Sequence, residues 1–143
     1  MNISDWSRRI TSFIHEIADV DIQEKVWLTR HPVEQSSFTE VICGLYDDCS
    51  FESYLLELNN HKINSKLLTR ILIFKSALDD YLSNIESKNL SDRQIVADPD
   101  WQVIVLLAVN AECDINSIIE HITDPYHKQS WVRTTEIERS QFL

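Results

Sequence analysis

Glycine is almost absent from this sequence of 143 residues: Gly44 is the only one, and there are three prolines. Hairpins and tight turns between strands need residues that tolerate a positive φ, and glycine is the main one. The composition therefore disfavours a sheet. Phosphate cradles of the P-loop and dinucleotide-binding types, and the GxSxG turn of serine hydrolases, each need glycines close together. All three kinds of site are excluded.

Cysteine pairs and long apolar runs are also lacking. Cys43, Cys49 and Cys113 form no CxxC pair, which favours reduced thiols over a disulfide framework or a zinc site. The longest apolar run is Val103–Val109, far short of the roughly 18 residues of a membrane span, and the N-terminus has no signal-peptide run. We therefore expect a cytoplasmic protein that does not bind a membrane.

Positive charge is missing from two long stretches. The chain has 23 Asp and Glu against 13 Lys and Arg, a net charge of −10, so it should repel nucleic acid and attract basic partners. Residues 31–61 and residues 94–127 contain no Lys or Arg, and each stretch holds six acidic residues. The preference of helix N-termini for acids explains Glu40, Asp98 and Asp100. It does not explain Asp47, which lies at the predicted C-terminal end of a helix.

Apolar residues recur at helical spacing along most of the chain. Residues 65–86 form the longest such segment, and a turn or short helix is expected around Leu90–Val96. The helix-start signals are Ser4, the Ser37–Glu40 capping box, Asp48 or Ser50, Ser65, Asp98 with Pro99, Asp114 or Asn116, and an open possibility at Asp124–Pro125.

The segment VIVLLAV (103–109) could form a buried strand by propensity alone. Asp98 as the cap and Pro99 in the first helical position are a specific helix-start signal, and they decide for a helix. The sequence thus predicts an all-α fold over residues 1–143. We expect a compact single-domain bundle of about seven helices, with a long central helix near 65–86 and no strand.

No group of residues has the spacing of a catalytic or metal site. His15 and Glu16 are followed by Asp19 at the position where a metalloprotease helix needs its second histidine. The adjacent carboxylates Asp47–Asp48 and Asp79–Asp80 would point about 100° apart on a helix, so neither pair shares a site. We therefore expect no enzyme, no cofactor and no metal.

The acids of the first stretch surround aromatic residues, as in a protein interface. Aromatic anchors would supply binding energy, and the acids around them would steer a basic partner. Residues 94–127 are the second candidate for this interface. The predicted contact residues are Glu40, Tyr46, Asp47, Asp48, Phe51, Glu52, Tyr54 and Glu57.

Four segments follow one another across about the middle two-thirds of the chain: EKVWL (24–28), SSFTEVICGLYDDCSFESYL (36–55), RILIFKSALDDYL (70–82) and DPDWQVIVLLA (98–108). In pattern and order they resemble immunity proteins of bacterial contact-dependent growth inhibition. The resemblance implies a cytoplasmic inhibitor of the toxic C-terminal domain of a large effector protein. Such domains are commonly nucleases with basic clefts, ribonucleases being favoured here, and an acidic surface would occupy the cleft or lie beside it.

Two other classes of function stay open. A cytoplasmic adaptor would bind a peptide or helix in an apolar groove, and its affinity would respond little to salt. An enzyme would need a pocket of histidines and carboxylates that sequence separation hides.

Overall fold

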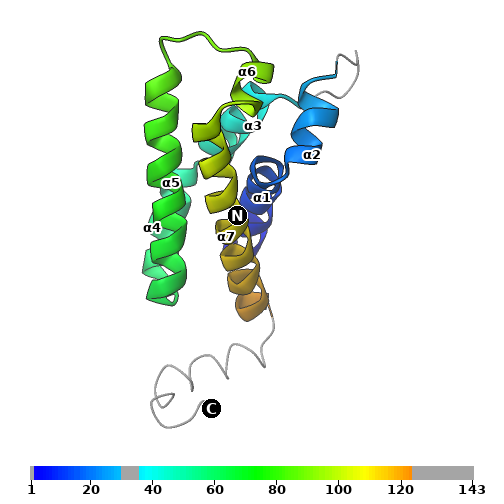
Figure 1. The fold of residues 1–143 in the computed structure, drawn as a ribbon. Coiled ribbons are helices and arrows are strands. Elements are labelled where there is room, and N and C mark those ends of the chain that lie inside the picture. The colour runs from blue at the N-terminus through cyan, green and yellow to red at the C-terminus, as the bar shows by residue number, and fades with distance from the viewer. Residues whose placement is uncertain (1, 30–35, 124–143) are drawn as a thin grey trace.

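The computed structural model describes residues 2–29 and 36–123, and every regular element within these ranges is a helix (Figure 1). The elements are α1 (Ile3–Ala18), α2 (Val20–Ile22), the π-helix η1 (Gln23–Trp27), α3 (Phe38–Cys43), the π-helix η2 (Gly44–Asp48), α4 (Phe51–Asn60), α5 (Ser65–Ile85), α6 (Asp92–Val96) and α7 (Pro99–Thr123). This confirms the predicted all-α class.

Four helices make the body of the molecule. Helix α7 packs between α1 and α5, and α4 contacts the same two helices, so α4 and α7 lie on opposite sides of the bundle (Figure 1). Helix α3 and η2 pack on α1, whereas α6 and η1 contact each other at the end where α7 begins.

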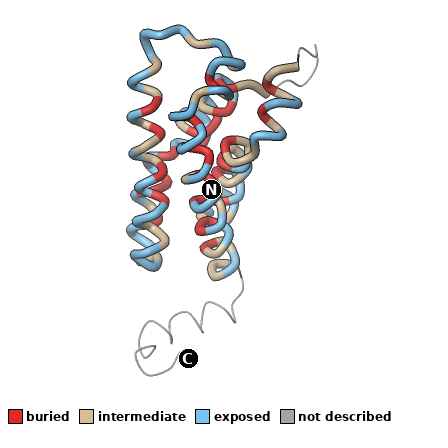
Figure 2. The backbone as a smooth tube through the Cα atoms, in the orientation of Figure 1, coloured by how far each residue is buried: buried red, intermediate tan, exposed pale blue. Residues whose placement is uncertain are grey.

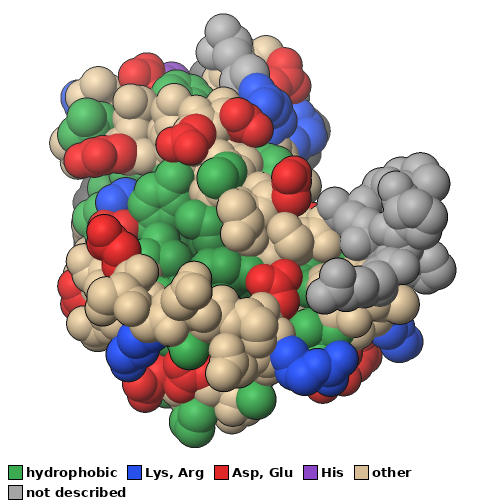
Figure 3. Space-filling view, turned by 90° about the horizontal axis from the view of Figure 1, so that it is seen from above, with side chains coloured by type: hydrophobic (Ala, Val, Ile, Leu, Met, Phe, Trp, Pro, Cys, Tyr) green, Lys and Arg blue, Asp and Glu red, His purple; other side chains and the backbone are tan. Residues whose placement is uncertain are grey.

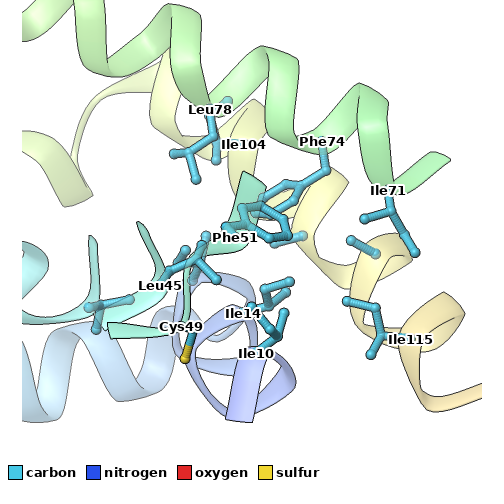
Figure 4. Packing of buried hydrophobic residues seen from close by; sticks show 14 of the residues in the cluster. Ile10, Ile14, Leu45, Cys49, Phe51, Ile71, Phe74, Leu78, Ile104 and Ile115 are labelled. Carbon is cyan, nitrogen blue, oxygen red and sulfur yellow. The ribbon is translucent and has the colours of Figure 1, made fainter. Parts of the chain in front are cut away.

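One hydrophobic cluster fills the space between these helices. Buried positions run along the inward sides of the helices, and exposed positions lie outward (Figure 2). At its centre the rings of Phe51 and Phe74 lie 6.2 Å apart, with Ile10 and Ile14 of α1 on one side and Ile115 of α7 on another (Figure 4). All five side chains are fully buried.

The segment that resembled a strand forms part of α7. The Asp98 carboxylate accepts a hydrogen bond from the Asp100 amide at 3.0 Å, and Pro99 begins the helix, as predicted. The expected new start at Asp114 or Asn116 is wrong, because α7 continues for 25 residues to Thr123. The predicted long helix forms as α5, with 21 residues. The central helix is α7 instead, because it is longer and packs between α1 and α5.

The predicted caps hold in part, and two of them are shifted. Helix α5 is capped by Asn64 instead of Ser65. The Ser37 hydroxyl accepts from the Glu40 amide at 3.1 Å, and Ser50 precedes α4. The first helix is capped by Asn2 instead of Ser4, since the Asn2 carbonyl oxygen accepts from the Asp5 amide at 2.8 Å. The possible helix from Asp124 lies outside the described residues.

A buried glutamine ties three elements together at the end of the bundle. The Gln23 side chain donates to the Glu16 and Ile17 carbonyls, both at 2.9 Å, and accepts from the Trp101 indole at 3.0 Å. All polar positions of this fully buried amide therefore have partners, as burial requires. The contact fixes η1 against both α1 and α7.

The single glycine is required by close packing, not by its backbone angles. Gly44 has φ −61°, which any residue adopts, but a Cβ here would lie 2.3 Å from the Phe13 ring. Alanine normally stabilises a helix by about 1 kcal/mol over glycine. Here we expect Gly44→Ala to lower the free energy of unfolding by about 1–2 kcal/mol, because overpacking outweighs that gain.

Urea denaturation of four proteins tests this expectation: wild type, Gly44→Ala, Phe13→Ala and the double variant. In the Phe13→Ala background the clash is gone, so Gly44→Ala should become neutral or stabilising. An equal loss of stability in both backgrounds would show that the Phe13 ring is not the cause.

Candidate functional site

The predicted contact surface is centred on η2 and the first turn of α4. Asp47 and Asp48 end η2, Glu52 lies in the first turn of α4, and all three are exposed. Glu40 is exposed in the first turn of α3. These four acids have no Lys or Arg of the described chain within ion-pair distance, about 4 Å.

Glu57, the fifth acid of the predicted contact surface, has a partner within the fold. Glu57 lies one turn further along α4, where its carboxylate is 3.4 Å from His61 Nε2. Its side chain is 45% exposed. The fold therefore places Glu57 at the edge of the acidic surface and gives it a partner within its own helix.

The turn that carries Asp47 and Asp48 has an unusual backbone. Residues 44–48 form a π-helix, which closes with a hydrogen bond from the Cys49 amide to the Gly44 carbonyl at 2.9 Å. Ser50 then adopts the left-handed conformation, with φ 49°, before α4 begins. Single π-helical turns occur frequently at functional sites, and nothing in the sequence pattern pointed to this one.

Contacts from helix α1 hold η2 and the start of α4 in place. The Trp6 indole donates to the Cys49 carbonyl at 2.6 Å, and the Ser7 and Tyr54 hydroxyls are hydrogen-bonded at 2.7 Å. The Phe13 ring packs against Gly44, the first residue of η2. Both ends of the acidic turn are thus fixed by the same helix.

Two of the predicted aromatic anchors are not on the surface. Phe51 and Tyr54 are fully buried in the core, so the prediction that they contact a partner is wrong. Burial also raises the pKa of Tyr54 to about 12. Phe51, Tyr54, Leu55 and Leu58 have the spacing of the inner face of a helix, and both aromatic side chains pack in the core.

Tyr46 is half-buried and remains beside the acids. The Tyr46 hydroxyl donates to Asp79 at 2.5 Å. Lys75 also donates to Asp79, at 2.7 Å, and its ammonium lies 5.6 Å from the centre of the Tyr46 ring. Burial, followed by the bond to Asp79, raises the pKa of Tyr46 far above its ordinary value. The hydroxyl therefore stays protonated and is engaged within the fold.

The fold brings bases toward a stretch that has none in sequence. Lys75 of α5 lies against Tyr46, as described above. Arg9 of α1 offsets part of the increase that burial causes in the pKa of the Cys49 thiol. Sequence spacing missed both contacts, because each depends on how α1 and α5 pack against η2.

Most described acids of residues 94–127 form hydrogen bonds or ion pairs within the fold. Asp98 caps α7 and accepts from the Tyr81 hydroxyl at 2.9 Å, while Glu112 is 2.7 Å from His15. Asp114 is buried and accepts two bonds from Arg70, at 2.9 and 2.5 Å. Of this stretch, Asp100 and Glu120 are exposed, and Asp124 lies outside the described residues.

A hollow with a mixed polar and apolar lining lies at the end of the bundle where α7 begins. It has a volume of about 340 Å³ and lies between α2, η1, α6 and α7. Its lining includes Val20, Leu28 and Val96, with Glu24 and Arg93 as its charged members. Figure 3 views this end of the molecule and shows hydrophobic side chains gathered near its middle, with acidic side chains around them.

The described residues form no metal-binding cluster, and one of their segments has the composition of a membrane span. In these ranges no three His, Cys, Asp or Glu side chains lie close enough together to hold a metal ion. One segment, Pro99–Ile122, is long and apolar enough to cross a membrane by length and composition. In this fold it belongs to α7, which α1 and α5 cover on two sides.

No protein-family model, curated protein or solved structure matches this chain. The function is therefore inferred from the surface of the chain itself.

The pair between Arg70 and Asp114 yields a prediction that separates structural acids from surface acids. The Asp114 side chain is 4% exposed, so Arg70→Ala leaves a buried carboxylate without its cation. We expect Arg70→Ala to lower the midpoint of thermal unfolding. Adding Asp114→Asn should then recover part of the loss, because it removes the buried charge.

The matched control is Arg8→Ala, since Arg8 pairs with Asp5 at 3.6 Å where both side chains are more than half exposed. Exposed pairs contribute little to stability, so this midpoint should hardly move. Equal midpoints for Arg70→Ala with and without Asp114→Asn would contradict the account.

Proposed function

We propose that this chain is an immunity protein that binds and neutralises a basic toxin domain through the acidic surface of η2 and α4. One observation supports this most directly: Asp47, Asp48 and Glu52 are exposed and have no base within ion-pair distance in the described chain. The acids of the second stretch, by contrast, mostly have partners inside the fold. Carboxylates without a partner inside the chain remain able to form ion pairs with a basic protein.

The proposed mechanism is competition by charge. A nuclease binds the phosphates of nucleic acid in a basic cleft, and clustered carboxylates present a similar pattern of negative charge. The half-buried ring of Tyr46 lies within this surface and offers apolar contact area. The immunity protein then covers the cleft or lies beside it, and nucleic acid is excluded. A ribonuclease is the favoured partner, and the complex needs no cofactor.

The rigidity of the turn supports a high affinity. Contacts from Trp6 and Phe13 of α1 already fix η2 in the free protein. A surface held in its binding conformation loses less conformational entropy when it binds. Tight binding suits an inhibitor that must outcompete a toxin's substrate in the cytoplasm.

Removal of the central acids tests the surface. We expect the triple variant Asp47→Ala, Asp48→Ala, Glu52→Ala to bind the toxin domain at least tenfold more weakly, mainly through slower association. Its affinity should also depend less on salt, since fewer charge pairs are left to screen. Surface plasmon resonance at several salt concentrations measures both effects.

The matched control is the triple variant Asp80→Ala, Glu86→Ala, Glu120→Ala. These three acids are also exposed, so the control changes the net charge by the same amount at other places. Its binding should stay close to wild type. Equal losses in the two triple variants would mean that net charge matters and the η2 surface does not.

Growth is the direct test of the function. The C-terminal domain of the large surface protein encoded beside this gene would be expressed with and without the chain. Rescue of growth together with co-purification of the two proteins is the expected result. Growth arrest that the chain fails to relieve would contradict the pairing.

A second candidate function rests on the hollow between α2, η1, α6 and α7, whose lining includes Val20, Leu28 and Val96. An adaptor could hold a helix or peptide there by burial of apolar surface. The salt dependence of the affinity distinguishes the two functions. Affinity for a peptide in the hollow should change little with ionic strength, whereas affinity for a basic partner at the η2 acids should fall.

A further inference from the structure

The outer face of α7 is exposed and uncharged. Seven residues between positions 102 and 116 are exposed, and none of them is charged, although a quarter of all residues in the chain are Asp, Glu, Lys or Arg. Three are large hydrophobics: Val103 is 54% exposed, Leu106 68% and Val109 41%. The other four are Gln102, Asn110, Cys113 and Asn116.

These residues form one continuous stripe. Val103, Leu106, Val109 and Cys113 are spaced three, three and four residues apart, so they lie on one side of the helix. At a rise of 1.5 Å per residue the stripe is roughly 20 Å long. The other sides of α7 are buried against α1 and α5. The stripe does not take part in this packing, so the described fold does not require it to be apolar.

The stripe faces away from the acidic surface. Helix α4 contacts α1 and α5 on the side of the bundle opposite α7 (Figure 1). Glu52 lies on α4, and η2 contacts α4 directly. A partner on the outer face of α7 would therefore leave the acids of η2 and α4 accessible.

The composition of the stripe points to a second copy of the same chain. In a two-fold interface each patch meets its own copy, so its residues must tolerate themselves as neighbours. Apolar side chains do, and so do Asn and Gln, because an amide both donates and accepts hydrogen bonds. Charged side chains do not, and two chains of net charge −10 repel each other wherever acids meet.

We propose that the chain forms a two-fold symmetric dimer through the outer face of α7. The neighbouring helix α5 extends this face with Ile73, 49% exposed. Arg70, one turn earlier on α5, is 54% exposed, and its charge is paired with Asp114 of α7. Two antiparallel helices from each copy would then pack as a four-helix arrangement. This inference does not depend on the proposed toxin binding.

The dimer should be of moderate affinity. Stable interfaces bury about 800 Å² per partner, and a face of one to two helices over roughly 20 Å lies at or below that size. We expect a dissociation constant of about 10 μM. Added salt should strengthen the dimer, since it screens the repulsion between two acidic chains, whereas it should weaken a complex with a basic partner.

Sedimentation equilibrium of the full chain tests the proposal. At about 100 μM, well above the expected dissociation constant, the mass should approach twice that of the 16.7 kDa chain. Leu106→Glu places two like charges close together across the two-fold axis, so it should weaken association at least tenfold. Because the side chain is exposed, this variant should keep its helical circular dichroism.

The matched control is Leu56→Glu on α4. Leu56 is 65% exposed against 68% for Leu106, so the same substitution adds the same charge at an equally exposed leucine on the opposite side. This variant should dimerise like wild type. Two results would overturn the proposal: a wild-type chain that stays monomeric at about 500 μM, or a dimer that both variants weaken equally.

A monomeric wild type would leave two other occupants for the stripe, residues 124–143 of the same chain or a different protein. Deletion of residues 124–143 would then distinguish them by whether the shortened chain begins to self-associate. The growth assay and the sedimentation assay have separate readouts. Failure of one therefore does not decide the other.

Discussion

Helix α7 packs between α1 and α5, and this double contact governs most of what the structure shows. The sides of α7 that face α1 and α5 are apolar because they are buried. The exposed Val103, Leu106 and Val109 make the rest of VIVLLAV apolar too, so the segment also suits a strand. The buried sides and this exposed stripe together give Pro99–Ile122 the length and composition of a membrane span. The polar groups that fix α7 are few and specific: Trp101 bonds Gln23, and Asp114 bonds Arg70.

Local signals in the sequence predicted the helices well. Asp98 with Pro99 and the Ser37 hydroxyl act as the caps that their residue types favour. The errors arise where a tertiary contact gives a residue another role. Asp114 looks like a helix cap, but it is a buried partner of Arg70 from α5, and so no new helix begins there. Sequence separation of this kind hides the partner.

The candidate site was predictable only in part for the same reason. Exposure of Asp47, Asp48 and Glu52 agrees with the expected acidic surface. The π-helical backbone of η2 has no sequence signature, and the approach of Lys75 to Tyr46 depends on the packing of α5. The spacing of Phe51 and Tyr54 suits the inner face of a helix, which is incompatible with their predicted role as surface anchors. Burial of their large apolar area decides for the first.

The chain thus presents an acidic surface and an uncharged surface on opposite sides of one bundle. The acids near η2 stay unpaired, at a cost in self-repulsion that a fold alone does not require. The stripe on α7 avoids charge altogether, in a chain where charge is common. Both features lie outside the contacts that hold the helices together. The proposed partners, one basic and one identical to the chain itself, would account for both, and the opposite responses to salt would allow each to be measured in the presence of the other.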